Sequence, residues 1–175
     1  MSKIVGVIGA NKILPSSDGY QFGFVLGEML VDKNYFIVCG GREGIMEAVC
    51  RGAHKSDNYF EGCTIGILPS DNRNEANHWC DIIIPTGMGF SRNQIIVNTA
   101  DIIIAISGGS GTLSELSFAW QLGKKVVCYT GIDGWTKKLA GTDLDDRYSG
   151  LFVPAETLDE ILEIVDKHFK DKLQL

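Results

Sequence analysis

Short apolar runs alternate with longer amphipathic stretches along the chain. The runs are rich in isoleucine and valine, which is typical of strands covered on both faces of a sheet. They occupy residues 4–8, 35–39, 63–68, 82–85, 102–106, 125–129 and 151–153. Between most of these runs, apolar residues recur at helical spacing. This spacing predicts helices over residues 18–34, 45–53, 92–100 and 157–169, and another that opens near Thr112.

This alternation predicts the fold class. Strands that alternate with helices form parallel sheets with right-handed crossovers. We therefore expect an α/β protein with a Rossmann-like, doubly wound and mainly parallel sheet of about six or seven strands and helices on both faces. Because neither a linker nor a break in composition interrupts the pattern, residues 1–175 are expected to form a single domain.

The segment from residue 102 to residue 115 is predicted to organise the rest of the chain. An isoleucine-rich run is followed by a turn, 107–111, in which three glycines let the backbone bend sharply and approach a ligand. Thr112 and Ser114 are expected to cap the helix that follows. Backbone N–H groups at such a helix start, Ser110 included, favour a phosphate. Glu115, one turn into the helix, is placed to reach the rest of that ligand.

Several glycines share one predicted position in the fold. Each lies just after a predicted strand, and together they are Gly9, Gly40, Gly41, Gly87, Gly89, Gly108, Gly109 and Gly131. The carboxyl ends of parallel strands meet at one edge of the sheet, where ligands bind in open α/β folds. Glycine also serves strand-to-helix turns for steric reasons alone. The coincidence of all these glycines on one edge favours a binding site there.

Charged and polar side chains near these glycines have two interpretations each. Arg92 stands at a predicted helix start, where a cation is unfavourable unless an anion binds beside it, so we favour a ligand-binding role. Asn93 either contacts the ligand or is an ordinary first-turn residue. Arg42 and Glu43 either pair at the surface or line the same edge. Glu115 is either a favourable first-turn carboxylate or a general acid or base.

Composition narrows the classes of function. The chain carries 16 Lys and Arg residues against 22 Asp and Glu residues, for a net charge of −6. This balance argues against non-specific nucleic-acid binding but permits a single nucleotide as ligand. Neither a targeting segment nor a membrane-length apolar run is seen, so we expect a cytoplasmic protein without membrane contact. The five cysteines are scattered among apolar neighbours, so we expect buried free thiols and neither a disulfide framework nor a metal site.

Three common motifs are missing from the sequence. The first strand leads into Gly9-Ala10-Asn11 rather than G-x-G-x-x-G, which does not favour NAD as a cofactor. A Gly-Lys-Ser/Thr step, which a P-loop requires, does not occur. Gly109-Ser110-Gly111 is followed by Thr112 and so departs from the G-x-S-x-G motif of serine hydrolases.

Residues 107–115, Ser-Gly-Gly-Ser-Gly-Thr-Leu-Ser-Glu, resemble the P-G-G-x-G-T-x-x-E motif of the Lonely Guy family, whose members were long misnamed lysine decarboxylases. Arg92 and the segment 40–49 also resemble that family, and the likeness extends roughly over residues 3–129.

The resemblance implies hydrolysis of the N-glycosidic bond of a nucleoside 5′-monophosphate, with no required cofactor, in a homodimer. Arg92 and Glu115 would be the catalytic pair. The phosphate would be held by Gly108, Gly109, Gly111 and Thr112. Such a reaction builds positive charge on the ribose, which a carboxylate can stabilise.

Three departures from the sequence pattern of the Lonely Guy enzymes point to a second hypothesis. Ser107 replaces the motif's proline, Asn93 stands where the enzymes have lysine, and Arg42 follows two glycines where the enzymes tend to have three. These features resemble a sister branch that includes molybdenum cofactor carrier proteins. Two functions therefore remain open for this phosphorylated ligand: hydrolysis of a nucleotide, or non-catalytic binding of the molybdenum cofactor or another phosphorylated molecule by a carrier or sensor.

Overall fold

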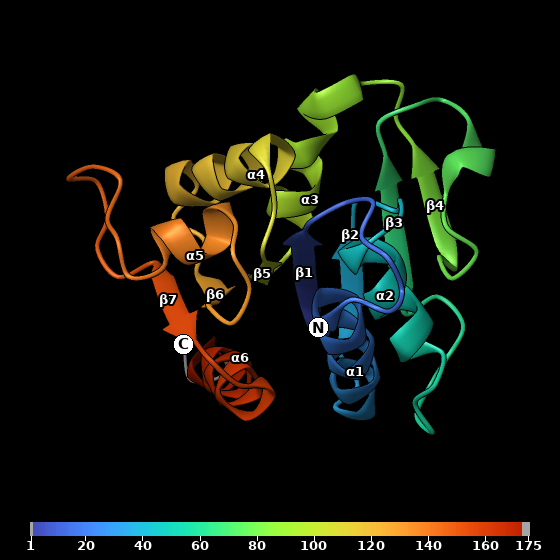
Figure 1. The fold of residues 1–175 in the computed structure, drawn as a ribbon, viewed down its shortest axis with the longest axis horizontal. Coiled ribbons are helices and arrows are strands. Elements are labelled where there is room, and N and C mark those ends of the chain that lie inside the picture. Colours follow the sequence, from blue (N-terminus) through green and yellow to red (C-terminus); the bar gives the residue numbers. More distant parts are fainter. Residues whose placement is uncertain (1, 173–175) are drawn as a thin grey trace.

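The computed structural model describes residues 2–172 of the chain and contains one seven-stranded sheet (Figure 1). The strands run in the order β4-β3-β2-β1-β5-β6-β7, and each neighbouring pair is parallel. Their bounds are β1 Ile4–Gly9, β2 Phe36–Cys39, β3 Thr64–Leu68, β4 Ile82–Pro85, β5 Ile102–Ile106, β6 Val126–Tyr129 and β7 Phe152–Ala155. The predicted α/β fold with a doubly wound parallel sheet is confirmed.

Helices cover both faces of this sheet. Their bounds are α1 Asp18–Asp32, α2 Ile45–Ala53, α3 Asn93–Thr99, α4 Ser110–Gln121, α5 Trp135–Leu139 and α6 Leu158–Lys172, with short 3-10 helices η1 Arg73–Glu75 and η2 Gly89–Arg92. The sequence pattern predicted every α-helix except α5, whose five residues follow a glycine-containing turn and are too few to show a helical period. Within residues 2–172, no helix is long and apolar enough to cross a membrane.

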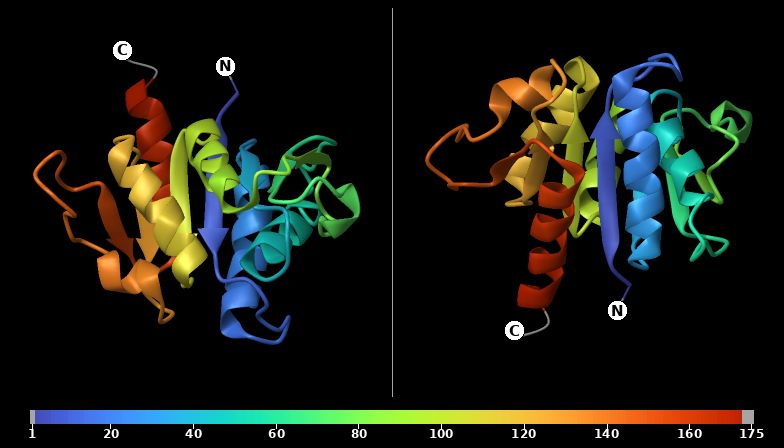
Figure 2. Two further views of the ribbon diagram at one scale, coloured as in Figure 1. Left: turned by 90° about the horizontal axis from the view of Figure 1, so that it is seen from above. Right: turned by 60° about the horizontal axis from the view of Figure 1, so that its bottom comes forward.

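Two apolar layers hold the helices to the sheet. Helices α1, α2 and α6 lie on one face of the sheet, and α3 and α4 lie on the other (Figure 2). Their buried side chains belong to two separate apolar clusters. All five residues of β5 are buried, as the isoleucine-rich run predicted. Because β5 alternates its side chains between the two layers, it forms part of both cores.

The order of the strands creates a crevice beside β1. Strands β2 to β4 extend the sheet on one side of β1, and β5 to β7 extend it on the other. The chain leaves β1 for α1 on one face and leaves β5 for α4 on the opposite face. The two loops therefore diverge at the carboxyl ends of β1 and β5, which is the position of ligand crevices in open α/β sheets.

Side-chain caps begin two of the helices as expected. Tyr20 N–H donates to Ser17 Oγ at 3.3 Å at the start of α1, and Glu160 N–H donates to Thr157 Oγ1 at 3.2 Å at the start of α6. The expected caps of α4 are wrong, because that helix begins earlier, at Ser110.

Instead, Thr112 Oγ1 donates to the carbonyl of Gly9 at 3.2 Å and Ser114 Oγ donates to that of Gly111 at 2.7 Å. Across the described residues, the first N–H groups of α4 receive no side-chain cap. These groups are therefore available to a ligand.

Glycines allow α1 and α2 to pack with their backbones almost in contact. A Cβ atom at Gly52 of α2 would overlap the carbonyl group of Phe24, and one at Gly27 of α1 would overlap that of Val49. The close approach holds the C-terminal half of α2 against α1. Alanine has a higher helix propensity than glycine, by about 1 kcal/mol. At these two positions, however, its Cβ would overlap the backbone of the neighbouring helix.

We therefore expect Gly52→Ala to destabilise the protein. The steric overlap should outweigh the gain in propensity and lower the free energy of unfolding by about 2 kcal/mol, which corresponds to a Tm lower by about 4–8 °C. Thermal unfolding followed by circular dichroism measures this change. Gly111→Ala is the matched control, because a Cβ at Gly111 meets no described atom within 4 Å. A Tm equal to or above the wild-type value for Gly52→Ala would contradict the packing argument.

Candidate functional site

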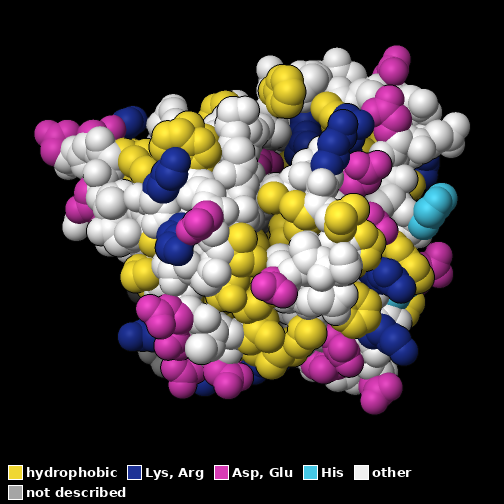
Figure 3. All heavy atoms as spheres, in the orientation of Figure 1, with side chains coloured by type: hydrophobic (Ala, Val, Ile, Leu, Met, Phe, Trp, Pro, Cys, Tyr) yellow, Lys and Arg dark blue, Asp and Glu magenta, His cyan; other side chains and the backbone are white. Residues whose placement is uncertain are grey.

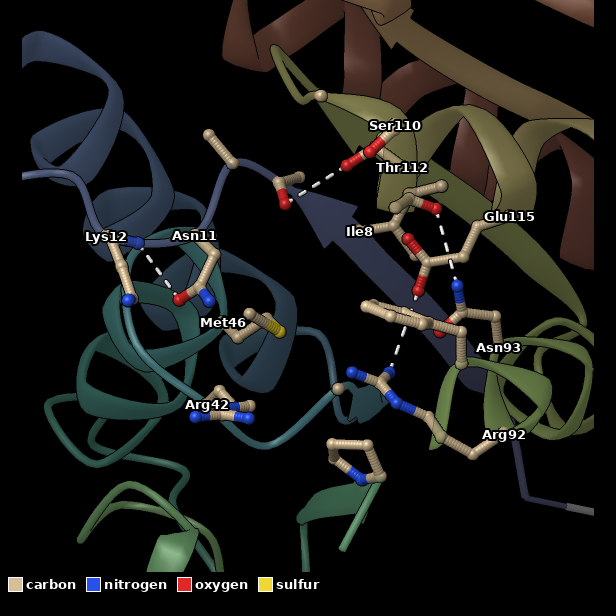
Figure 4. A pocket seen from close by; sticks show the side chains of 17 residues that line it. Ile8, Asn11, Lys12, Arg42, Met46, Arg92, Asn93, Ser110, Thr112 and Glu115 are labelled. Atoms are coloured by element: carbon tan, nitrogen blue, oxygen red, sulfur yellow. Dashed lines mark hydrogen bonds and ion pairs between the residues drawn. The ribbon is translucent and has the colours of Figure 1, made fainter. Parts of the chain in front are cut away.

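A cavity of about 470 Å³ opens at the carboxyl ends of β1, β2 and β5, beside the N-terminus of α4 (Figure 4). Its lining consists of Ile8, Gly9, Ala10, Asn11, Lys12, Gly40, Arg42, Met46, Pro69, Phe90, Arg92, Asn93, Gly109, Ser110, Gly111, Thr112 and Glu115. It lies at the crevice that the strand order creates. Ten of the residues proposed from the sequence line it, namely Gly9, Gly40, Arg42, Arg92, Asn93, Gly109, Ser110, Gly111, Thr112 and Glu115.

Gly89, Gly131 and Glu43 are not among the described lining residues, and neither are three other proposed residues, Gly41, Gly87 and Gly108. Gly41 turns toward β3 and donates its N–H to Cys39 Sγ at 3.4 Å. Gly87 has a positive φ of 63° and lies next to Asp71. Gly108 supports the turn before α4, where a side chain would overlap Thr112. All three adopt left-handed backbone conformations that glycine adopts without strain, and this gives each of them a conformational role.

The turn before α4 has a backbone that excludes proline. Ser107 adopts a φ of 58°, whereas the proline ring fixes φ near −65°. Ser107 Oγ donates to the carbonyl of Asp133 at 2.7 Å, and Thr136 Oγ1 donates to the carbonyl of Ser107 at 2.6 Å. These bonds tie the turn to the start of α5. They explain why serine suits the position at which the related motif has proline.

Arg92 and Glu115 lie together in the cavity, and both are buried, with 8% and 7% of their surface exposed. The Arg92 Nη1 and Glu115 Oε1 atoms are 3.7 Å apart, which is an ion pair but too long for a hydrogen bond. Among residues 2–172, Arg92 Nε and Nη1 have no hydrogen-bond partner. The guanidinium packs against Gly40, where a Cβ would lie 2.5 Å from Nη1, so a larger residue there would displace the guanidinium.

Burial controls the protonation of this pair. Removal of the carboxyl from water raises the pKa of Glu115 to about 7, although the positive charge of Arg92 opposes the rise. Burial likewise lowers the pKa of Arg92, with Glu115 opposing. Desolvation therefore outweighs attraction for both groups at 3.7 Å. A carboxyl with a pKa near 7 can both accept and donate a proton under neutral conditions.

Two further cations face the pair from the other side of the cavity, and Figure 4 shows Lys12 and Arg42 there. Figure 3 also shows Lys and Arg side chains together in the upper part of the molecule, to the right of its centre, over the region of β2 and β3 in Figure 1. Arg42 forms its ion pair with Glu75, at 3.6 Å between partly exposed groups, rather than with Glu43. Such a pair contributes little, so Arg42 remains available to an anion.

Sequence reasoning missed Lys12, which follows β1 in a left-handed conformation with a φ of 56°. Its position in the loop directly after the first strand, at the glycine-bearing edge, was the available signal.

Asn93 is engaged within the protein. Its Nδ2 donates to Ser114 Oγ at 2.7 Å, and that hydroxyl donates in turn to the carbonyl of Gly111. These bonds join the first turn of α3 to the first turn of α4. Asn93 thereby fixes the distance between the helix that carries Arg92 and the helix that carries Glu115.

Comparison with known sequences places the chain in a family. The sequence model of the SLOG cluster4 family matches residues 2–161. The chain belongs to this family. It is 37% identical over 123 residues to an uncharacterised protein of Archaeoglobus fulgidus, a match that covers 70% of this chain and 77% of that protein. It is 28% identical over 154 residues to a cytokinin riboside 5′-monophosphate phosphoribohydrolase of Mycobacterium marinum, with 79% and 80% of the two chains covered.

Solved structures resemble this SLOG cluster4 protein over nearly its whole length. A molybdenum cofactor binding protein of Rippkaea orientalis is 29% identical, with a TM-score of 0.81 and 95% and 97% of the two chains covered. The molybdenum cofactor carrier protein of Chlamydomonas reinhardtii is 27% identical, with a TM-score of 0.80 and 97% and 99% covered. The resemblances drawn from the sequence motifs, to the Lonely Guy enzymes and to the cofactor carriers, are both confirmed.

The raised pKa of Glu115 predicts a pH dependence of stability. Below pH 4.5, the ordinary pKa of this carboxyl, it is protonated in both states. As the pH rises from there, the unfolded chain releases its proton first, and the folded protein retains its own until about pH 7. The free energy of unfolding should therefore fall over this interval by on the order of 3 kcal/mol and then level off.

Urea unfolding of the wild type and of Glu115→Gln at several pH values measures this effect. The variant cannot titrate at this position, so the difference between the two proteins isolates Glu115 from every other group. A difference that stays constant between pH 4.5 and 7.5 would show that Glu115 has its ordinary pKa in the folded protein, and a change of the opposite sign would show a lowered pKa; either result contradicts the prediction.

Proposed function

We propose that this SLOG cluster4 protein binds a phosphorylated, nucleotide-like small molecule in the cavity and hydrolyses the N-glycosidic bond of a nucleoside 5′-monophosphate. The observation that carries the proposal is the buried Arg92–Glu115 pair, which lies beside the uncapped N-terminus of α4. Two properties of the pair suit a catalytic role better than a purely structural one. The carboxyl of Glu115 has a pKa of about 7, and buried donors of the Arg92 guanidinium have no partner among the described residues.

The phosphate of the ligand would sit at the start of α4. The N–H groups of Ser110, Gly111 and Thr112 are among those that a helix leaves unsatisfied, and the helix dipole favours an anion there. Lys12 and Arg42, which also line the cavity, would add positive charge. This arrangement uses backbone donors for the phosphate and leaves the two buried side chains for the rest of the ligand.

Glu115 would act on the ribose. In its ionised form the carboxylate stabilises the positive charge that develops at C1′ as the C–N bond breaks, and it accepts a proton from the water that attacks C1′. The base departs with the electron pair of the broken bond and takes up a proton, which leaves ribose 5-phosphate. Arg92 would hold the ligand through its unpartnered donors and keep C1′ near the carboxylate.

A second candidate function is non-catalytic binding of the molybdenum cofactor or another phosphorylated molecule. Asn93 favours it, because its amide is bonded to Ser114 at the position where the hydrolases have lysine, and the cavity therefore lacks that cation. The similar solved structures that bind or carry the molybdenum cofactor favour it as well. The phosphate site at α4 serves both functions, so they differ only in whether Glu115 acts on a bond.

Incubation with a panel of nucleoside 5′-monophosphates, followed by chromatography of the released base, tests the proposal. We expect release from at least one nucleotide, and a fall in kcat of about 100-fold or more in Glu115→Gln, because general acid–base groups contribute factors of this size. Binding of ribose 5-phosphate to the variant should change little. Glu163→Gln, an exposed position on α6, is the matched control and should keep full activity.

Release of base that is unchanged in Glu115→Gln would contradict the role of Glu115. If no nucleotide is hydrolysed, native mass spectrometry of the freshly purified protein decides between the two functions. A phosphorylated pterin retained through purification would support the carrier, and its mass would identify the ligand.

A further inference from the structure

Three buried thiols meet behind the Gly40–Gly41 turn, outside the cavity lining. Cys39 ends β2, Cys50 lies in α2, and Cys80 precedes β4. The sulfur atoms of Cys39 and Cys50 are 3.7 Å apart, those of Cys50 and Cys80 are 3.9 Å apart, and all three lie within 4.8 Å of one another. Segments distant in the sequence thus deliver three thiols to one point, which the scattered spacing of the cysteines did not predict.

We propose that Cys39, Cys50 and Cys80 bind one thiophilic metal ion, Zn²⁺ or Cu⁺, through their three sulfur atoms. A zinc–sulfur bond of about 2.3 Å in tetrahedral geometry places its sulfur ligands about 3.8 Å apart. The two separations of 3.7 and 3.9 Å match this spacing before any ion is bound. Soft thiolate ligands select these two ions among the common biological metals.

The surroundings of the cluster make room for the sulfur atoms. Gly66 lies in the middle of β3, where a Cβ would come within 2.8 Å of Cys80 Sγ. The absence of a side chain at Gly66 lets Cys80 reach the other two thiols. Gly41 N–H donates to Cys39 Sγ at 3.4 Å, a bond that also stabilises a thiolate. Backbone donors to sulfur of this kind commonly support metal-bound cysteines.

The two other cysteines provide a comparison within the same molecule. Cys63 and Cys128 are also buried and free, but neither has a sulfur partner among the described residues. They fit the ordinary behaviour of cysteine as a small apolar residue. Packing alone explains single buried cysteines, whereas it does not require three of them from separate segments to place their sulfur atoms together.

An ion at this position would fasten the segment between β3 and β4 to β2 and α2. That segment already docks on the cavity turn, since Asn77 N–H donates to the Gly41 carbonyl and Asn77 Nδ2 donates to the Arg42 carbonyl, both at 2.9 Å. The metal would therefore stabilise the turn that presents Gly40 and Arg42 to the cavity, whatever ligand the cavity takes. The inference does not depend on the proposed function.

Metal titration of the reduced, metal-free protein tests the proposal. We expect one equivalent of Zn²⁺ to bind per chain. A separate anaerobic titration with a competing chelator measures the affinity of the same three thiols for Cu⁺. The ion with the higher affinity identifies the metal. Excess ion should raise the Tm by about 5–10 °C, as expected for a ligand at about 100 times its Kd. Cobalt bound in place of zinc should show sulfur-to-metal charge-transfer absorption.

Variants locate the site. Cys50→Ala should weaken binding by at least about 100-fold and abolish the Tm increase, because second-shell changes alone cost 10- to 100-fold and this removes a ligand. Cys128→Ala, which deletes a buried thiol outside the cluster, is the matched control and should retain one equivalent. Equal metal affinity in Cys50→Ala and in the wild type would overturn the proposal.

X-ray absorption at the zinc edge gives a readout on the wild type that does not depend on how any variant folds. Three sulfur atoms at about 2.3 Å from the metal are expected. A shell of oxygen and nitrogen alone, or the failure of the reduced wild type to bind either ion, would equally overturn the proposal.

Discussion

The burial of one arginine and one glutamate side by side is the constraint on which the cavity depends. Arg92 and Glu115 are removed from water but held 3.7 Å apart, so neither is fully compensated by the other. The fold maintains this arrangement because α3 and α4 are anchored independently in the core around β5. A ligand with anionic or hydroxyl oxygens would satisfy Arg92 Nε and Nη1, which have no hydrogen-bond partner within residues 2–172.

Local hydrogen bonds set the geometry around this pair. Thr112 joins α4 to the end of β1 through the Gly9 carbonyl, and Asn93 joins α3 to α4 through Ser114. Ser107, in its left-handed conformation, fixes the direction in which α4 leaves β5. Each of these polar side chains is used to position backbone, and for that reason the first N–H groups of α4 stay open. In the proposed function, these side chains therefore position the backbone, and the backbone N–H groups are left to bind the ligand.

Much of this arrangement follows from local sequence signals. The isoleucine-rich run predicted the buried strand β5, and the glycines after successive strands predicted the edge at which the cavity lies. Arg92 was found because a cation at a helix start needs an anion nearby.

Other features arise from contacts between distant segments and could not be read locally. Thr112 was expected to cap its own helix, yet it bonds to Gly9, 103 residues away in the sequence. The cluster of Cys39, Cys50 and Cys80 depends likewise on how segments distant in the sequence come together. The type of each element was thus set by its own residues, whereas the partners of individual side chains were set by the topology.

The central claim is that an anionic group binds at the N-terminus of α4, beside the buried pair. The most direct measurement is an NMR titration of isotope-labelled protein with ribose 5-phosphate, followed through the backbone amide signals. The account predicts saturable shifts that are largest at the amides of Ser110, Gly111 and Thr112, with smaller changes at the Arg92 side-chain N–H signal. Shifts concentrated elsewhere on the molecule, or the absence of any saturable change at these amides, would contradict it.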